Sequence, residues 1–481
     1  MLKVIKSHWI FYSLIFLFFI DFFSVVHPLV PFDMDDWINM GLARPGYPSL
    51  DPHVYNPAKI LPEILQPLTA KVAAYVIAPV TGDYIGALTW ANAIMVSLFI
   101  VLFLYEAQRL IEQRFQTGRW CSFALILLFT LFHFQFFRTD DQNNDYLWYA
   151  TDPTCFFHYV IPDLLCAALV LWLMRNDIRE VRRPFILSLL LLAGYLALCS
   201  NLYASVILIA YIGSVLVVRL CRTDFHQKGW LSEYVRDNLI YLAVILFWLV
   251  IQWFEANGRR ASHTSSDNTF LTDIWLTCRA LLSVHCNVTF VIISLLAIIG
   301  AKVHHYLHRS RRIGNLGRDG ETLLLSLVFS SLYLLLLSAK VGPNYIQRPG
   351  VIFAFVVFYL IISLLALAYL CRQIPGSRIL LPLLICFVYC DINTRERTFK
   401  DVHYETGTDI QTCIRVNNDI VHQVQLADAR GETEAQIDVP RFNEEGNWPL
   451  ALDCSCYLGR TLYKHNMTRR LVETYFNPTE Q

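Results

Sequence analysis

The first stretch that could carry chemistry is Asp33-Met34-Asp35-Asp36-Trp37, where three carboxylates fall within four residues directly after a long apolar run. Desolvation near an apolar boundary raises the pKa of a carboxyl group, and such a group can take a proton from a hydroxyl. An ordinary solvated loop is the simpler interpretation, and Trp37 also fits an anchor at a membrane surface. We treat Asp36, Asp33 and Asp35 as candidate bases, in that order, and Trp37 as a candidate substrate contact.

Basic and polar residues of other loops could bind an anion. Lys59 and Glu63 are spaced i, i+4 on a helix predicted near residues 60–77. They could form a surface ion pair, or Lys59 could meet a lipid phosphate. Arg348 follows Tyr345 and Gln347 between two apolar runs. Its guanidinium can hold a phosphate through two parallel hydrogen bonds, although an arginine that only reaches for lipid headgroups would look the same.

A basic pair, Arg259-Arg260, follows another apolar run and could attract an anionic lipid carrier. A flexible basic loop is the alternative. Together the sequence predicts phosphate contacts at Arg348, Lys59, Arg259 and Arg260, and substrate contacts at Trp37, Glu63, Tyr345 and Gln347.

The composition shows which elements must position these residues. Of the 481 residues, 55% are hydrophobic and 16% are charged, whereas soluble domains have about 45–50% apolar and about 25% charged residues. An all-α polytopic membrane protein is therefore expected. The formal net charge of zero gives no reason to expect a nucleic-acid partner.

A helix needs about 20 apolar residues to cross a bilayer. We predict eleven spans on this basis: 8–30, 84–105, 120–137, 156–174, 185–201, 203–219, 238–255, 285–303, 321–339, 350–371 and 379–390.

The loops on the amino-terminal side of these spans hold 20 Lys and Arg residues, and the opposite loops hold nine. Positive charge concentrates on the cytoplasmic side, so we expect a cytoplasmic amino terminus. An odd number of spans then puts the carboxyl terminus on the outer side of the membrane.

Residues 1–390 are expected to form the membrane domain, with residues 31–83 as its first outer loop. Residues 391–481 are polar and are expected to form a small outer segment, either independent or docked on the loops. A disulfide between Cys413 and Cys454 or Cys456 is possible there. Within the spans, Asp21 and Asp163 are candidate functional carboxylates, with packing inside the bundle as the simpler interpretation.

No nucleotide-binding signature of the P-loop or dinucleotide type occurs in the sequence. We therefore expect no nucleotide cofactor. No metal ligand set is predicted either, although three aspartates could hold a divalent cation.

A cytoplasmic amino terminus, about eleven spans, the motif Asp33-Met34-Asp35-Asp36-Trp37 in the first outer loop and a polar outer tail together resemble a GT-C glycosyltransferase. The closer likeness is to the Gtr-type glucosyltransferases that modify the O-antigen of lipopolysaccharide and convert its serotype. The resemblance implies a GT-C-like bundle, a polyprenyl-phosphate sugar such as undecaprenyl phosphate glucose as donor, and a lipid-linked polysaccharide as acceptor. It also implies that a first-loop aspartate is the base and that the outer segment near Asp453–Lys464 contributes to activity.

Two other functions fit the composition. One is a transporter or flippase of lipid-linked sugars, which would be expected to show paired repeats and helices broken in mid-membrane. No such repeat is visible. The other is an O-acyltransferase or ligase of surface polysaccharide, for which His158 and His285 are available without a clear motif.

Overall fold

The structure is a computed structural model that describes residues 2–42, 48–136, 148, 152–259, 269–282, 286–308, 314–374, 376–395 and 408–480. Regular structure in these ranges is almost entirely helical. Nine helical segments are long and apolar enough, by length and composition, to cross a membrane. The chain is therefore an all-α polytopic membrane protein, to which a small region with two β-strands is added near the carboxyl terminus.

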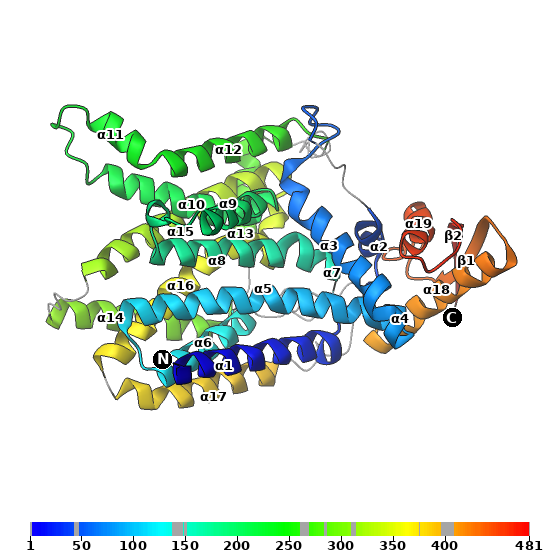
Figure 1. The fold of residues 1–481 in the computed structure, drawn as a ribbon, viewed down its shortest axis with the longest axis horizontal. Coiled ribbons are helices and arrows are strands. Elements are labelled where there is room, and N and C mark those ends of the chain that lie inside the picture. Colours follow the sequence, from blue (N-terminus) through cyan, green and yellow to red (C-terminus); the bar gives the residue numbers. More distant parts are fainter. Residues whose placement is uncertain are drawn as a thin grey trace.

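The long helices lie alongside one another in a bundle (Figure 1). They are α1 (Leu2–Asp21), α5 (Tyr84–Phe115), α6 (Arg119–Gln135), α8 (Ile161–Arg175), α9 (Pro184–Leu198), α10 (Leu202–Leu220), α12 (Leu239–Ala256), α14 (Val288–His308), α15 (Gly314–Val341), α16 (Pro349–Gln373) and α17 (Ser377–Arg395). Helix α1 begins at one end of the bundle, and the carboxyl-terminal region lies beyond the other end. The two termini are thus separated by the length of the bundle, as the odd number of predicted spans requires.

Each of the eleven predicted spans falls on one of these helices, and eight coincide with segments that meet the length and hydropathy requirement. The other three fall on α6 and α9, which are short at 17 and 15 residues, and on α17, which contains Pro382. Helices α9 and α10 are separated by only Cys199, Ser200 and Asn201. Asn201 ends this break by accepting a hydrogen bond from the backbone N–H of Tyr203 (2.7 Å), which caps α10.

The ninth long apolar segment, Pro57–Thr81, was predicted as a helix at the membrane surface. It consists of η2 (Pro57–Lys59), α3 (Ile60–Val72), the π-helix η3 (Ala73–Ile77) and α4 (Ala78–Thr81). Figure 1 shows that this segment runs obliquely across the end of the bundle, whereas its neighbour α5 runs along it. Its course differs from that of the long helices, but its length and composition meet the requirement for a span, so its position at the membrane surface stays a prediction.

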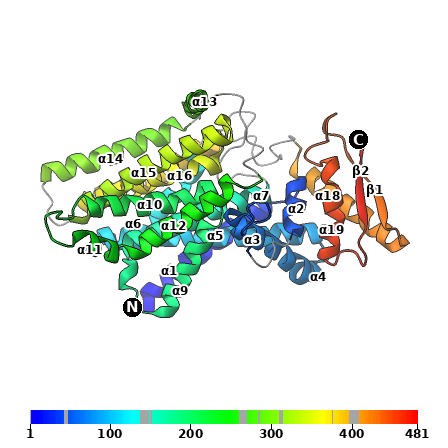
Figure 2. The same ribbon diagram turned by 90° about the horizontal axis from the view of Figure 1, so that it is seen from above.

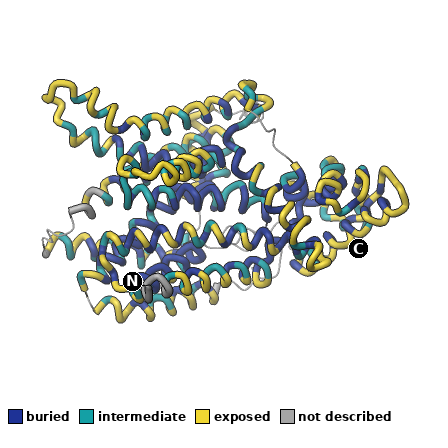
Figure 3. The backbone as a smooth tube through the Cα atoms, in the orientation of Figure 1, coloured by how far each residue is buried: buried dark blue, intermediate teal, exposed yellow. Residues whose placement is uncertain are grey.

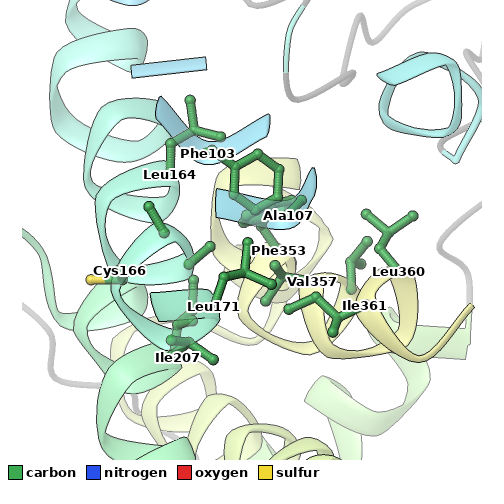
Figure 4. Packing of buried hydrophobic residues seen from close by; sticks show 14 of the residues in the cluster. Phe103, Ala107, Leu164, Cys166, Leu171, Ile207, Phe353, Val357, Leu360 and Ile361 are labelled. Carbon is green, nitrogen blue, oxygen red and sulfur yellow. The ribbon is translucent and has the colours of Figure 1, made fainter. Parts of the chain in front are cut away.

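The core of the bundle is formed by α5, α8, α10 and α16 (Figure 4). Phe103, Leu164, Ile207 and Phe353 interdigitate there and are almost completely inaccessible. Close packing matters in a bilayer because lipid tails are as apolar as leucine, so van der Waals contact must hold the helices together. The outer helix α12 buries only Tyr241, Ile251 and Phe254, and the rest of it is exposed or half-buried apart from its first cap residue (Figure 3), as expected for a surface that faces lipid.

The region from residue 408 folds into a small domain that the sequence did not predict in detail. It contains α18 (Ile410–Arg430), β1 (Glu434–Pro440), α19 (Cys456–Lys464) and β2 (Glu473–Thr479). The two strands pair in parallel, with Glu434 opposite Glu473. Ala435, Ile437 and Val439 point inward in the alternating pattern of a half-buried strand. All thirteen cysteines of the chain lie in the described ranges and none is in a disulfide, so the proposed pairing of Cys413 is not formed.

This carboxyl-terminal domain is docked on residues of the segment 31–83. Helix α19 packs on α2 (Met34–Gly41), and Thr461 Oγ1 donates a hydrogen bond to the backbone oxygen of Trp37 (2.8 Å). Lys464 Nζ donates to the backbone oxygen of Gly41 (2.6 Å), and the Tyr84 hydroxyl is 2.6 Å from His465 Nδ1. The two regions share one hydrophobic cluster that includes Trp37. Of the two arrangements left open by the sequence, the structure therefore shows the docked one.

Gly41 permits the close approach of α19. A Cβ atom added at Gly41 would lie 1.9 Å from Thr461 Oγ1, so we expect Gly41→Ala to displace Thr461 and to break its bond to Trp37. Such overpacking typically costs about 1–3 kcal/mol. The expected result is faster proteolytic release of the carboxyl-terminal domain and a lower unfolding temperature. Gly118→Ala is the matched control, because an added Cβ there meets nothing within 4 Å.

Candidate active site

The acidic motif begins helix α2 at the end of the bundle. Asp33 caps this helix, and its Oδ1 accepts a hydrogen bond from the backbone N–H of Asp36 (3.0 Å). Asp36, three residues later, returns a bond by accepting from the backbone N–H of Phe32 (3.1 Å) through Oδ2. This reciprocal arrangement is close to a capping box, which explains why the two carboxylates stand three residues apart.

Asp36 also joins α2 to a distant part of the chain. Its Oδ1 accepts hydrogen bonds from both the backbone N–H and the hydroxyl of Thr154, each 2.8 Å long. Thr154 lies in α7 (Pro153–Cys155) and its hydroxyl accepts a bond from Gln66 Nε2 of α3 (3.1 Å). Both oxygens of Asp36 are therefore occupied, whereas among the described residues only Oδ1 of Asp33 receives a hydrogen bond.

Asp152 completes the site, and the sequence analysis missed it. Carboxylate oxygens of Asp33, Asp36 and Asp152 all lie within 4.8 Å of one another, and all three side chains are buried. Asp152 caps α7 by accepting a bond from the backbone N–H of Cys155 (2.6 Å). The sequence Asp152-Pro153 does carry a signal for a helix start, because Asp is favoured at the cap and Pro at the first helical position. We refer to these three residues as the acidic cluster.

Burial and mutual repulsion dominate the electrostatics of the acidic cluster. The pKa of Asp33 is raised well above its usual value by burial, and further by the charges of Asp36 and Asp152. The pKa of Asp36 is raised by burial and by Asp152, although its hydrogen bonds from Thr154 and Phe32 oppose the shift. Three adjacent carboxylates cannot all ionise at low cost, so at least one must hold a proton or face a cation.

The acidic cluster is also the group of described residues that could hold a metal ion. Divalent cations such as Mg²⁺ and Ca²⁺ prefer carboxylate oxygens, and Mg²⁺ commonly uses one or two carboxylates together with water and phosphate oxygens. The donor set of Asp33, Asp36 and Asp152 fits such a cation.

Two residues of the motif are placed away from this chemistry. The side chain of Asp35 is exposed and does not belong to the acidic cluster, although its charge contributes to the raised pKa of Asp33. The side chain of Trp37 is fully buried in the hydrophobic cluster shared with the carboxyl-terminal domain. The prediction that Trp37 contacts a substrate is therefore corrected: it packs the domain interface.

Lys59 and Glu63 lie on the segment that leads to the acidic cluster. Both side chains are half-buried, and together with Gln66 they are spaced i, i+4, i+7 on one face of the η2–α3 segment. Gln66 reaches Thr154, the partner of Asp36. Lys59 thus lies about 10 Å along the helix axis from Gln66, the residue that connects α3 to Thr154 and Asp36.

Arg348 caps α16 at this same end of the bundle. Its side chain is exposed, and the guanidinium carbon lies 4.4 Å from the ring centroid of Tyr345. Tyr345 in turn stacks on Tyr203 of α10, with a centroid distance of 6.2 Å and an interplanar angle of 13°. Gln347 does not take part in this stack; its Nε2 donates a hydrogen bond to the backbone oxygen of Ala280 (3.4 Å).

Helix α16, which begins directly after Arg348, contacts the π-helix η5, which follows Asp152 and α7. Gly350, in the first turn of α16, lies so close to Tyr159 that an added Cβ would come within 2.7 Å of the Tyr159 Cβ atom. Tyr159 belongs to the π-helix η5 (Phe156–Val160), which continues directly from α7. A third π-helix, η1 (Phe22–Val26), precedes the acidic motif. Such π-turns frequently occur at functional sites.

The two remaining predicted phosphate contacts are Arg259 and Arg260. Arg259 is exposed just after α12, and Gly258 beside it lies against the backbone of Pro52 in the segment 31–83. Arg260 and His285 lie outside the described residues.

The two candidate carboxylates within the predicted spans differ in burial. Asp21 is exposed on α1, and Asp163 is fully buried with no hydrogen bond to either oxygen among the described residues.

The Thr154 hydroxyl gives a test of the network. Thr154→Val keeps the backbone bond to Asp36 but removes the hydroxyl that donates to Asp36 and accepts from Gln66. A hydrogen bond to a charged group contributes about 1.5–3 kcal/mol, so we expect a clearly lower unfolding temperature in detergent. Thr154→Ser keeps the hydroxyl and should stay close to the wild type. Equal stability of the Val variant and the wild type would contradict this network.

The site therefore combines a buried group of carboxylates, in which one oxygen of Asp33 receives no hydrogen bond from a described residue, with cationic side chains on adjoining elements. This arrangement suits proton abstraction from a hydroxyl next to an anionic leaving group. Comparisons of the chain with protein-family models, with curated proteins and with solved structures find no match.

Proposed function

We propose that this protein is an integral membrane glycosyltransferase of the GT-C type. It would move a hexose such as glucose from a polyprenyl-phosphate donor to an O-antigen or another lipid-linked surface polysaccharide. The observation that carries the proposal is the buried acidic cluster at the end of a membrane bundle, beneath a docked polar domain. A site in that place can accept a donor whose tail stays in lipid while its sugar reaches a water-facing acceptor.

In the proposed reaction, Asp33 takes the proton from an acceptor hydroxyl. The hydroxyl oxygen forms a bond to the anomeric carbon of the donor sugar as the bond from that carbon to the phosphate oxygen breaks. The polyprenyl phosphate leaves with the bonding electron pair, and the proton remains on Asp33. Asp33 is favoured over Asp36 because both oxygens of Asp36 already accept hydrogen bonds. This choice reverses the order expected from the sequence.

The departing phosphate gains negative charge, so preorganised cations at that position would accelerate the reaction. Arg348 and Lys59 are the candidates for this role, and Arg259 is a third. The exposed guanidinium of Arg348 lies against the ring of Tyr345, and its planar fork has the geometry that binds a phosphate through two hydrogen bonds.

The proposed orientation follows the distribution of basic loop residues, with the amino terminus in the cytoplasm and the carboxyl-terminal domain in the periplasm. It is supported by the position of α1 and the carboxyl-terminal domain at opposite ends of the bundle (Figure 1). On this orientation the acidic cluster faces the periplasm of a bacterial inner membrane, where lipid-linked polysaccharide is accessible.

The direct test is expression in a bacterial host that makes an O-antigen of known structure and supplies polyprenyl-phosphate glucose. We expect an added hexose on the polysaccharide, detected by mass spectrometry and linkage analysis, and no addition when the Asp33→Asn variant is expressed at the same level. An unmodified polysaccharide in the presence of correctly inserted wild-type protein and donor would contradict the proposed function.

A further inference from the structure

Two adjoining cavities lie at the end of the bundle that is remote from the acidic cluster. Helix α5 contacts the carboxyl-terminal domain through Tyr84 and has Arg114 near its other end, about 45 Å away along the helix. Arg114 lines a polar cavity of about 370 Å³, and a second, apolar cavity of about 390 Å³ lies beside it. Leu173 and Tyr241 line both cavities, so the two cavities adjoin each other.

The apolar cavity opens to the side of the bundle. It lies between α8, α9, α10 and α12. Helix α9 projects away from the other helices (Figure 2), and only Ala197 and Leu198 near its end are buried. With 15 residues, α9 is about 22 Å long, which is shorter than the roughly 30 Å hydrocarbon core of a bilayer. A Cβ added at Gly194, which lines this cavity, meets nothing within 4 Å.

The polar cavity presents arginine side chains with unused hydrogen-bond donors. Arg175 is only 10% exposed; its Nη2 pairs with Glu106, while its buried Nε makes no hydrogen bond to a described residue. Arg219 donates to Asn238 (2.7 Å) and lies over the ring of Tyr241. Arg114 is paired with Asp319 (3.0 Å). A phosphate group placed among these guanidinium groups would receive several charge-assisted hydrogen bonds.

The acidic residues of the polar cavity restrict the choice of headgroup. Asp177, Glu180 and Asp319 line it beside the three arginines, so the lining has no net charge. Asp177 and Asp319 take part in ion pairs with arginine, whereas Glu180 forms none with any described residue. A purely anionic headgroup would face Glu180 unfavourably. A headgroup with a phosphate and an ammonium group satisfies both signs of charge.

We propose that the two cavities together bind one zwitterionic phospholipid of the phosphatidylethanolamine type. Its phosphate lies against Arg175 and Arg219, its ammonium group against Glu180, and one hydrocarbon chain between α9 and α12. The phosphate would be held by the positive charges of Arg175 and Arg219, which line the polar cavity, and the chain would fill space that α9 leaves open. This binding site is separate from the proposed transfer reaction and does not depend on it.

The test measures lipid retained by the full-length protein after delipidation in detergent, by native mass spectrometry. Dioleoyl phosphatidylethanolamine is compared with phosphatidylglycerol and diacylglycerol carrying the same chains, and with free phosphoethanolamine. We expect one retained molecule of phosphatidylethanolamine and weaker retention of the other three. Equal or stronger retention of phosphatidylglycerol would overturn the assignment of a zwitterionic headgroup, and equal retention of diacylglycerol would overturn the polar half of the site.

Variants distinguish this site from lipid bound elsewhere. Gly194→Phe should occupy the apolar cavity and abolish retention, whereas Leu192→Phe, at an exposed position of α9 outside the cavity, should leave it unchanged. Arg175→Lys keeps the charge beside Glu106 and should raise the dissociation constant about tenfold, since one charge-assisted hydrogen bond is lost. Glu180→Gln, on an exposed turn, provides a second headgroup variant. Unchanged retention in both Gly194→Phe and Glu180→Gln would refute the proposal.

Discussion

Asp33→Asn is expected to reduce sugar transfer by about 10²–10⁴-fold, the usual contribution of a general base, without loss of stability. Asparagine can still cap α2, because its side-chain oxygen accepts the hydrogen bond from the backbone N–H of Asp36 as the carboxylate does. The substitution removes one of three negative charges from the acidic cluster. A loss of activity in this variant would therefore report on chemistry and not on unfolding.

The sign of the stability change follows from the raised pKa of Asp33. The folded state binds the proton more tightly than the unfolded state, whose aspartate has a pKa near 3.9. The folded wild type consequently loses stability as pH rises from about 4 to the raised pKa. The neutral variant avoids this loss, so its advantage in unfolding temperature should be absent at about pH 4 and should grow toward neutral pH.

Asp35→Asn is the matched control, because Asp35 is on the same helix but exposed. It should retain both activity and stability. Full activity of Asp33→Asn would remove Asp33 from the role of base and return that role to Asp36 or Asp152. A large fall in the unfolding temperature of Asp33→Asn at neutral pH would contradict the electrostatic account of the cluster.

Arg348→Gln is expected to have the second largest effect, a fall in kcat/KM of about 10²–10³-fold, comparable to the loss of one donor that stabilises transition-state charge. Arg348 is exposed and makes no cap hydrogen bond through its side chain, so the fold should tolerate the change. The stacking of its guanidinium on Tyr345 contributes only about 0.5–1 kcal/mol at an exposed site. Transfer from a polyprenyl-phosphate donor in detergent, measured over a range of donor concentrations, gives the two kinetic parameters.

Arg348→Lys sharpens this test. Lysine keeps the positive charge but lacks the planar fork that can grip a phosphate with two bonds. We expect it to recover part of the activity lost in the Gln variant. Arg236→Gln, at an exposed position of α11 (Trp230–Asp237), serves as a control for loss of surface charge. If Arg348→Gln kept wild-type kcat/KM, the phosphate role would pass to Lys59 or Arg259.

The sequence by itself determined the class of fold and the location of most helices. Long apolar runs report directly on membrane helices, because a bilayer requires about 20 consecutive apolar residues wherever a helix crosses it. The prediction at residues 203–219 coincides with α10, and the helix predicted near residues 60–77 coincides with α3 and η3. These are local properties, and a local pattern is sufficient to predict them.

Only the tertiary structure decided which residues form the site. Asp33 and Asp36 were predicted from their spacing, but Asp152 joins them through a contact between segments more than a hundred residues apart. Trp37 stood in the same motif, yet it is buried under α19, because the carboxyl-terminal domain docks there. Hydropathy and residue spacing describe one helix at a time. Which helix faces another depends on packing across the whole chain, and that information is not contained in any single segment.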